Sequence, residues 1–557
     1  MIFKKVQGKV DWKKIAQIVE NDDVCLSFGN YKLVIKRTTD FRVKIETTVE
    51  YLTQFSPTNW FLFIYNADFS NINIINAKSV KLDSNSSSDI ILYGNTGLVL
   101  QTLEYIHLRF KGPIDNEEIY KNIKQCNTPM SLSQVHTMQL SLAGEKARNY
   151  LSHVVSGKYL FDISSNIIPG VALTFRDGNA QNKSYGYGRA FKFKDAFDIA
   201  ALEAVERFVS QFYAYDCKDQ TILATYNELK SKAYSPEVFV LEENSKINND
   251  SKLYWTKAQS LIDGSSIWIP EDLAVYGNNA YRRNYIRKIH DSSNGVSLGG
   301  SYSEATIGAL LELIERHSFL ATWFGKIPGQ KIFNFKRNLN SEMHYAVTRL
   351  EREGYQIELF EISVISPVYV VWCLIRNNKA NANMFSYSAA GSGLMLSEAV
   401  NAALKEALVG MSVYSNNQKS MPKVPEKLKT LEDHVRYYGN SSTKKAFDFT
   451  KNFSGFVDDK RYLTFGKEPT SVSRNKVVEV IISQLEKCFK DILIVNLTSA
   501  YLRKHSLYAV KAVVPGMFPM TFGDKSLRIN LEDINRLRAK RGLSNLEKFE
   551  NIPHPFP

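Results

Sequence analysis

The sequence has no run of about 18 consecutive apolar residues, the length that a helix needs to cross a lipid bilayer. The N-terminal stretch MIFKKVQGKVDWKK also lacks the continuous apolar segment of a secretory signal. Cysteines are few, five in 557 residues, and they are scattered singly without a C-x-x-C pair or a histidine at ligand spacing. These absences argue against a membrane-spanning protein, a disulfide framework and a zinc module. We therefore expect a cytoplasmic protein with reduced thiols.

Acidic residues are outnumbered, but the positive charge is not concentrated anywhere. The chain has 70 Lys and Arg against 57 Asp and Glu, a net charge of +13 at pH 7, which favours anionic partners such as ATP, an acidic peptide or nucleic acid. The densest basic stretch, residues 282–288, is interleaved with Asn284, Tyr285 and Ile286. No signature of a nucleic-acid-binding fold accompanies it, so we expect no nucleic-acid partner.

Three segments repeat one pattern, in which glycines precede a helical segment with carboxylates at fixed steps. The glycines stand at 186 and 188, at 299 and 300, and at 391 and 393, and the helical segments that follow span 195–207, 304–316 and 398–410. The aligned acids are Asp195, Glu304 and Glu398, then Glu203, Glu312 and Glu406 eight residues on, then Glu206 and Glu315 three further on. Because positions three and eleven residues apart share a helix face, each helix presents its acids as a stripe.

The repeats predict a site for a nucleotide and magnesium. Their other residues are mostly Ala, Leu, Ile and Val, as in packed helices, and carboxylates in such surroundings need cations. Mg²⁺ prefers carboxylate and phosphate oxygens. We interpret the glycines as turns that hold a phosphate against helix N-termini or backbone N–H groups. A single E-x-x-E-R is usually a solvated ion pair, but recurrence with one spacing favours a shared site.

The pattern along the chain divides it into two parts. Residues 1–140 combine a short amphipathic helix around Trp12 with strand-like runs at 31–35, 60–65 and 90–93. They have no clustered catalytic groups, which predicts a small α+β accessory domain for docking. Residues 150–557 alternate strand-like runs with the three repeats, which predicts one catalytic domain of mixed α/β class. We expect residues 438–475 to form a polar insertion or lid, and residues 553–557 to form a stiff P-x-P-x-P tail.

Several motifs occur in a specific order in the second part. They are A-x-E-A-V-E-R at 201–207, D-S-S-N-G at 291–295, E-A-x6-E-L-I-E-R at 304–316, V-P-G at 514–516, and the P-x-P-x-P end. This set resembles the YcaO-domain family, and specifically its ATP-dependent cyclodehydratases of azole-containing ribosomal peptides. The resemblance covers about residues 150–557. It implies a YcaO-type fold with the repeated units around a nucleotide site, and ATP and Mg²⁺ as cofactors.

The resemblance also implies roles for individual residues. The metal ligands would be Glu203, Glu206, Glu312 and Glu315. Further contacts to the cofactor would come from Arg189, Arg207, Glu304, Arg316 and Glu406. The carboxylate of Pro557, at the end of the stiff tail, would act as a catalytic group that moves protons or orders the substrate.

Some positions depart from the family pattern. Tyr187 replaces the lysine of a G-K-G motif, so we expect Arg189 to supply its charge. In the third repeat Ala402 and Val409 stand where an arginine and a glutamine are usual, which leaves open whether nucleotide binding is impaired there. His317 stands where relatives often have Asp, and is expected either to make a local hydrogen bond or to adjust the site.

In such relatives a Cys thiol, or a Ser or Thr hydroxyl, attacks the preceding amide carbonyl. ATP phosphorylates the resulting oxygen, and loss of phosphate leaves a thiazoline or oxazoline. The resemblance implies this reaction on a precursor peptide in bacteriocin or thiopeptide biosynthesis. Thioamide or amidine formation, or a degenerate scaffold that binds the precursor or a partner, stay open as alternatives. The implied partners are a separate leader-binding protein with a ThiF-like fold and a flavin dehydrogenase. We expect no membrane partner. Whether two copies of the chain form a homodimer stays open.

Overall fold

The computed structural model describes most of the chain after residue 115 and five short segments before it. The described residues are 2–5, 24–28, 31–37, 43–47, 88–92, 116–154, 156–163, 167–176, 183–216, 221–242, 245–275, 287–379, 382–416, 421–523, 527–550 and 552–556. Pro557, the helix expected around Trp12 and the strand expected at 60–65 lie outside them. Within these ranges no helix is long and apolar enough to span a membrane.

Five N-terminal strands form a sheet of their own. The strands lie in the order β1-β2-β3-β4-β5, with β1 and β2 parallel and the other neighbours antiparallel. They are β1 (Ile2–Lys5), β2 (Val24–Phe28), β3 (Tyr31–Arg37), β4 (Val43–Thr47) and β5 (Ser88–Leu92). The strands expected at 31–35 and 90–93 are thus confirmed. The docking role of this part of the chain stays a prediction.

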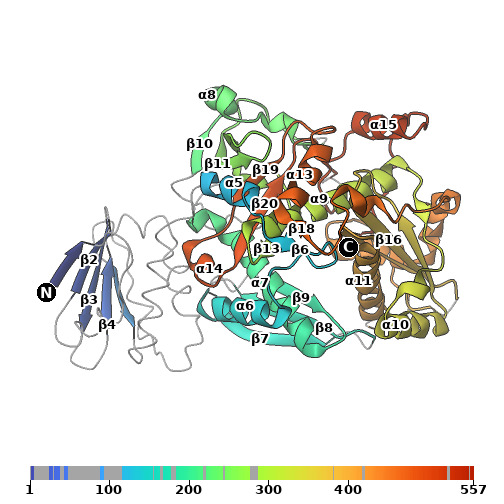
Figure 1. The fold of residues 1–557 in the computed structure, drawn as a ribbon, viewed down its shortest axis with the longest axis horizontal. Helices are drawn as coiled ribbons and strands as arrows, with labels where there is room; N and C mark the ends of the chain where they lie inside the picture. The colour runs from blue at the N-terminus through green and yellow to red at the C-terminus, as the bar shows by residue number, and fades with distance from the viewer. Residues whose placement is uncertain are drawn as a thin grey trace.

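Three antiparallel sheets follow, and each packs against one long helix (Figure 1). The sheet β7-β8-β9 packs on α7, the sheet β14-β15-β16-β17 packs on α11, and the sheet β10-β11-β19-β20-β13, with β12 beside β11, packs on α9. The strands are β7 (Ser156–Ile163), β8 (Gly170–Arg176), β9 (Lys183–Arg189), β10 (Thr221–Ala224), β11 (Leu253–Ser260), β12 (Ser266–Pro270), β13 (Val296–Gly299), β14 (Gln330–Lys331), β15 (Gln356–Glu361), β16 (Tyr369–Arg376), β17 (Ser386–Gly393), β19 (Leu493–Asn496) and β20 (Tyr508–Val513). The mixed helix-and-sheet class predicted from the sequence is confirmed.

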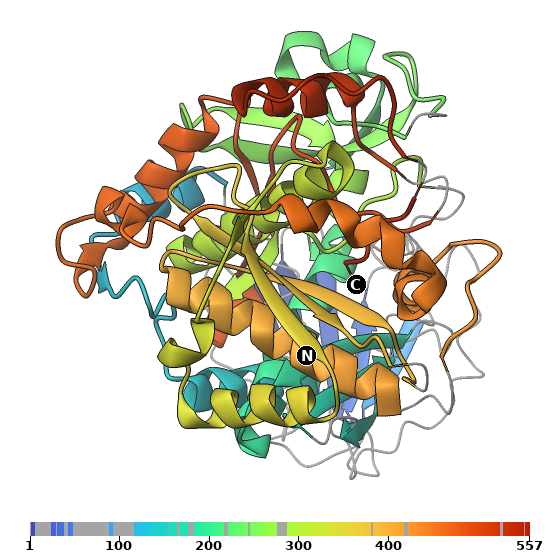
Figure 2. The ribbon, with the colours of Figure 1, turned by 90° about the vertical axis from the view of Figure 1, so that its right-hand side faces the viewer.

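The three repeats form the three long helices, as predicted. These are α7 (Phe193–Asp216), α9 (Tyr302–Gly325) and α11 (Leu396–Asn416). In Figure 2 the orange helix α11 runs across the yellow strands of the four-stranded sheet. The shorter helices are α5 (Asn116–Lys124), α6 (Leu140–Val154), α8 (Tyr226–Leu229), α10 (Ser341–Arg352), α12 (Leu431–Gly439), α13 (Arg474–Leu485), α14 (Ala500–Lys504) and α15 (Leu531–Lys540).

Five of the six glycines of the repeats lie in strands, so the prediction that they form turns is wrong for these five; Gly300 lies in the bend between β13 and α9. Gly186 and Gly188 belong to β9, and Gly391 belongs to β17. A Cβ atom on Gly186 would overlap the carbonyl oxygen of Ala200, and one on Gly188 would overlap that of Ala196. These glycines therefore let the backbone of a helix lie directly on the strand that precedes it, which is a second reason for glycine in a strand.

Residues 438–475, predicted to be a polar insertion or a lid, pack into the protein, and the lid finds no support. The insertion contains two 3₁₀ helices (Ser441–Asn452 and Arg461–Thr464) and the strand β18 (Val472–Ser473). Phe447, Phe453 and Phe465 are buried, and the ring centroid of Phe447 lies 5.6 Å from that of Trp323 in α9. The insertion is thus part of the hydrophobic core.

The catalytic part of the chain begins earlier than the predicted boundary at residues 140–150. Ile119 and Ile123 of α5 are buried in the same core as α9. The short strand β6 (Pro129–Met130) pairs with β18. These contacts place the start of this body at or before Asn116.

Candidate functional site

A cavity of about 690 Å³ lies between the three long helices. Side chains of all three repeats line it, although the repeats are separated by roughly a hundred residues each in the sequence. Among the residues predicted to bind the cofactor, those that line the cavity are Arg189, Glu203, Glu206, Arg207, Glu312, Arg316 and Glu406. At least one acid of each helix therefore faces a common space, as the spacing predicted, whereas the cavity wall does not include Asp195, Glu304, Glu315 and Glu398.

Each repeat pairs a cavity carboxylate with an arginine. Arg207 contacts Glu203 one turn earlier on α7, with 3.0 Å between Nη2 and Oε1. Arg316 makes a looser pair with Glu312, with 3.7 Å between Nη2 and Oε1. In the third repeat Glu406 of α11 faces Arg189 from the end of β9 at 3.6 Å.

Backbone groups fix two of these carboxylates. The N–H of Tyr187 donates to Glu203 Oε2 at 2.9 Å, and the N–H of Gly295 donates to Glu312 Oε2 at 2.9 Å. Arg207 also donates to the hydroxyl of Ser293. The segment before β13 therefore contacts the first and the second repeat at once.

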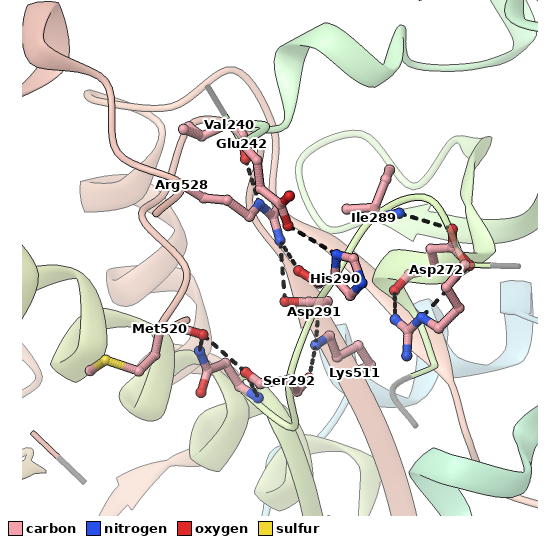
Figure 3. A network of polar contacts seen from close by, with 12 residues as sticks. Val240, Glu242, Asp272, Ile289, His290, Asp291, Ser292, Lys511, Met520 and Arg528 are labelled. Carbon is pink, nitrogen blue, oxygen red and sulfur yellow. Dashed lines mark hydrogen bonds and ion pairs between the residues drawn. The ribbon is translucent and has the colours of Figure 1, made fainter. Parts of the chain in front are cut away.

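A network of buried charged side chains contacts residues 291–295, the segment before β13 (Figure 3). Lys511 Nζ of β20 lies 2.9 Å from Asp291 Oδ2, and Arg528 Nη1 lies 3.5 Å from Asp291 Oδ1. Asn294 adds a hydrogen bond from its side-chain amide to the carbonyl of Met520 at 3.2 Å. Since Lys511 and Arg528 are almost completely buried, the network holds Ser293 and Gly295 in place beside the cavity.

Three cavity acids resist ionisation. Burial raises the pKa of Glu206 to about 8, and the nearby charge of Glu312 adds to the effect. Burial also raises the pKa of Glu315 to about 7, against the opposing effect of Arg316. The pKa of Glu312 is raised by burial as well. A divalent cation would supply the missing positive charge, so this donor set fits Mg²⁺.

Two buried arginine nitrogens fit a phosphate group. Of the three arginines that line the cavity, Arg189 and Arg316 each have a buried Nε without a hydrogen-bond acceptor. Buried donors of this kind are nearly always satisfied in a working protein, and guanidinium groups match phosphate oxygens in charge and geometry. Both side chains line the cavity, so the residues present fit a triphosphate bound together with the cation.

Three of the four predicted metal ligands, Glu203, Glu206 and Glu312, line the cavity, but they do not form a metal-binding cluster on their own. Within the described ranges no group of three or more His, Cys, Asp or Glu side chains is close enough to hold an ion. Mg²⁺ often takes only one or two carboxylates and completes its shell with water and substrate phosphates. The assignment of Glu203, Glu206, Glu312 and Glu315 as its ligands stays a prediction.

The structure does not bring every predicted residue to the cavity wall. Glu304, at the first turn of α9, is engaged by the N–H groups of Thr137 and Gly300 at 2.9 and 3.0 Å and by His136 Nδ1 at 2.9 Å. Its role at the cofactor stays a prediction without support from this geometry. Glu315 lies just behind the wall, where the charges of Glu312 and Glu406 contribute to its pKa.

The described chain ends beside Arg316. Phe556 is fully buried, and the guanidinium of Arg316 lies 4.0 Å from the centroid of its ring. The predicted catalytic residue Pro557 follows directly in the sequence but lies outside the described residues. Of the two expectations for His317, the structure supports the local hydrogen bond. Its Nδ1 accepts from the N–H of Phe518 at 3.2 Å.

Sequence reasoning missed the aromatic part of the cavity. Tyr187, Tyr387 and Tyr414 line it, together with Val413 and Leu431. A signal for Tyr414 existed, because it follows Glu406 by the same step of eight residues that separates the aligned acids of each repeat. Tyr387 carried no such signal, since only the pairing of β16 with β17 places it beside α11.

The fold and this cavity define a mixed helix-and-sheet protein with a site for a nucleotide and Mg²⁺. The chain belongs to the YcaO family: the family profile, described as YcaO cyclodehydratase, ATP- and Mg²⁺-binding, matches residues 159–518. ATP and Mg²⁺ are therefore the cofactors of this domain.

Solved structures share the fold at low sequence identity. YcaO from Methanopyrus kandleri bound with AMPPCP and Mg²⁺ is 19% identical with a TM-score of 0.51, over 69% of this chain and 92% of that one. A heterocyclase in complex with substrate and cofactor is 13% identical with a TM-score of 0.57, over 98% and 79%. The E. coli microcin synthetase McbBCD complex with pro-MccB17 bound is 16% identical with a TM-score of 0.52, over 72% and 96%.

Two curated relatives come from Mycobacterium tuberculosis, and both are described as uncharacterized proteins. Each is 26% identical to this chain over 190 residues. The match covers 33% of this chain and 41% of each relative, so less than half of their length is shared.

Proposed function

We propose that this chain catalyses ATP-dependent cyclodehydration of Cys, and of Ser or Thr as further substrates, in a ribosomally made precursor peptide. The reaction would form thiazoline or oxazoline rings in bacteriocin or thiopeptide biosynthesis. The observation that carries the proposal is the convergence of acids and arginines from three repeats on one cavity. The description of the family as a cyclodehydratase favours ring closure over thioamide or amidine formation.

The cavity residues would bind and orient the cofactor. Bound ATP with Mg²⁺ supplies the phosphoryl group that turns an amide oxygen into a phosphate leaving group. Glu206, Glu312 and Glu315 hold the cation once they are ionised, because their shared burial makes an added positive charge favourable. Arg189 and Arg316 would donate hydrogen bonds from Nε to phosphate oxygens, although Nε of Arg316 also lies 3.8 Å from Glu315 Oε1.

The C-terminal tail would supply the group that moves protons. Tyr438 donates its hydroxyl to the carbonyl of Pro553 at 2.5 Å, and His554 Nε2 lies 2.8 Å from the carbonyl of Thr521. Phe556 is fixed further along by the ring of Phe319, with 4.9 Å between centroids. The tail is held at these points up to Phe556, and we propose that the carboxylate of Pro557, the next residue, acts as the general base.

The partners belong to the proposal as well. We infer that the precursor peptide is presented by a separate leader-binding protein with a ThiF-like fold, that the N-terminal sheet docks it, and that a flavin dehydrogenase oxidises the rings. Support comes from the microcin synthetase, which is a complex of several proteins with its precursor bound.

Mass spectrometry tests the proposed reaction directly. The chain, its partner and the precursor peptide are incubated with ATP and Mg²⁺. We expect the loss of one water for each ring and the release of one phosphate for each ring. Glu315→Gln should abolish both, whereas Glu532→Gln, a change to an exposed acid on α15, should alter neither. In a parallel incubation with added sulfide, replacement of an oxygen by a sulfur would indicate thioamide formation instead, and ATP binding without any change of mass would favour the scaffold.

A further inference from the structure

Cys126 lies outside the nucleotide cavity, at a place where two helices begin. It carries a free thiol, is half-buried and follows shortly after α5. The N–H of Asn475, in the first turn of α13, donates to the carbonyl of Cys126 at 3.0 Å. Ser303, in the first turn of α9, hydrogen-bonds to the thiol through its side chain. Each helix N-terminus adds a partial positive charge beside the sulfur.

Further hydrogen-bond donors reach the sulfur from its own loop. Oγ1 of Thr128 lies 3.6 Å from Sγ of Cys126. The backbone N–H of Thr128 hydrogen-bonds to the thiol as well. The carbonyl of Thr128 accepts in turn from the N–H of Arg474 at 3.1 Å, which fixes this loop on α13. Because a thiolate accepts hydrogen bonds and donates none, these groups favour the ionised form.

Arg474 adds a full positive charge to the cluster. The residue is only 2% exposed, and its Nη1 donates to the carbonyl of Val135 at 2.6 Å. The charges of Glu304 and Cys126 both act on its guanidinium. Its Nε is buried without a hydrogen-bond acceptor among the described residues. One donor of this arginine is therefore left for an anionic group formed in the cluster.

Two other charged side chains lie close by. Glu304 opposes a second negative charge, but its carboxylate is engaged by the N–H of Thr137 at 2.9 Å and by Nδ1 of His136 at 2.9 Å. The hydrogen bond to Glu304 raises the pKa of His136, so this pair holds part of the opposing charge within itself. Lys124 of α5 lies with Nζ 5.7 Å from the ring centroid of Tyr120 on its own helix.

The contacts at the sulfur outweigh its burial. Burial by itself raises the pKa of Cys126, but the hydrogen bonds from Ser303 and Thr128 and the charge of Arg474 bring it below the ordinary value. Partial exposure, helix N-termini and a neighbouring arginine together are typical of reactive cysteines. Cys373 shows the opposite case, because complete burial in β16 raises the pKa of its thiol.

We propose that Cys126 is a site of reversible oxidation by hydroperoxides. The thiolate attacks one oxygen of hydrogen peroxide, the O–O bond breaks and hydroxide leaves, so the sulfur is oxidised to a sulfenic acid while the peroxide is reduced. The new oxygen, once deprotonated, is an acceptor for the buried Nε of Arg474. A low-molecular-weight thiol then attacks the sulfenic sulfur, and water leaves as a mixed disulfide forms.

Alkylation of the full-length chain tests whether the thiolate persists at low pH. Short pulses of iodoacetamide at pH 6.5 and pH 8.5 are read by mass spectrometry of the cysteine peptides. A cysteine in an unstructured reference peptide should slow about fiftyfold at the lower pH. Cys126 should slow less than about tenfold, and at pH 6.5 it should react faster than Cys488, although Cys488 is exposed. Cys373 should stay unlabelled.

Trapping of the oxidised form tests the second half of the proposal. The chain is treated with an equimolar amount of hydrogen peroxide and then with a cyclic 1,3-diketone, which captures sulfenic acids. Cys126 should carry this label. When glutathione replaces the trap, Cys126 should carry a mixed disulfide that dithiothreitol removes.

Three variants connect the reactivity to the cluster. Thr128→Val removes a donor at an exposed position, and Arg474→Gln removes the charge. Each should make the slowing of Cys126 between pH 8.5 and pH 6.5 at least about threefold larger. Ser133→Ala removes a hydroxyl of the same loop that bonds to Ser131 and not to the thiol, so it should leave the rates unchanged. If Arg474→Gln does not fold, Thr128→Val decides.

Three outcomes would overturn the inference. The first is a slowing of Cys126 as steep as that of the reference peptide. The second is a sulfenic-acid label on Cys126 no greater than that on Cys373, or confined to Cys488. The third is an unchanged pH dependence in folded Thr128→Val. None of these results would bear on the proposed ring-forming activity, because the measurements need neither ATP nor a precursor peptide.

Discussion

Binding of Mg²⁺ and ATP should become stronger as the pH rises from 6 to 9. The pKa of Glu206 is about 8, so roughly nine-tenths of this side chain is protonated at pH 7. Mg²⁺ binds the ionised carboxylate, and the proton must leave first. Below pH 8 the affinity should therefore fall about tenfold for each pH unit through Glu206, which amounts to about a hundredfold between pH 9 and pH 6. Glu315, with a pKa of about 7, should steepen the fall below pH 7.

Titration calorimetry with a non-hydrolysable ATP analogue and Mg²⁺ measures this dependence. Repeating the titration at pH 7 in buffers of different ionisation enthalpy counts the protons released, which should be close to one for Glu206. Glu206→Gln should bind more weakly at pH 9 and lose the slope between pH 7 and pH 9. Glu532→Gln should keep the slope, since that acid is exposed on α15. An affinity of the wild type that is constant from pH 6 to pH 9 would refute the assignment of these acids to the cation.

Three further predictions concern other parts of the chain. A fragment that starts just before Asn116 should keep ATP binding and lose partner binding, whereas one that starts at Tyr150 loses the buried helix α5 and should melt at a lower temperature; retained partner binding in the longer fragment would contradict the docking role. One or two glycines added after Pro557 displace its carboxylate by about 3.3–3.6 Å each, so ring formation should fall by orders of magnitude while ATP affinity is kept; full activity would make the tail structural only. Asp291→Asn leaves Lys511 without its buried partner and should cost about 3–5 kcal/mol in the free energy of unfolding, with weaker ATP binding in the folded fraction; a melting temperature equal to that of the wild type would contradict it.

The sequence predicted the repeated helices and their common cavity because both follow from local spacing. Acids at steps of three and eight residues on an apolar helix define one face, and an apolar helix with an acidic face must turn that face to a shared polar space. Glu203, Glu312 and Glu406 are the middle acids of the three stripes, and all line the cavity.

The predictions that failed concern residues whose surroundings are set by packing between different elements of the fold. Gly186 reads equally well as a turn residue or as a strand residue under a helix, and only the packing of α7 on β9 decides. Glu304 belongs to the predicted stripe, but Thr137, far away in the sequence, engages its carboxylate. The three phenylalanines of the insertion lie among many polar residues, so composition alone predicted a lid where the chain adds to the core.

The most direct test of the central claim is a titration of the ATP analogue into Glu206→Gln and Glu315→Gln, each with and without Mg²⁺. These acids come from two repeats, on α7 and on α9, and the claim is that both serve one cation and one nucleotide. We predict that each change weakens binding in the presence of Mg²⁺ and that omission of Mg²⁺ weakens binding to the wild type. Undiminished affinity in both variants would contradict a shared nucleotide site between the repeats.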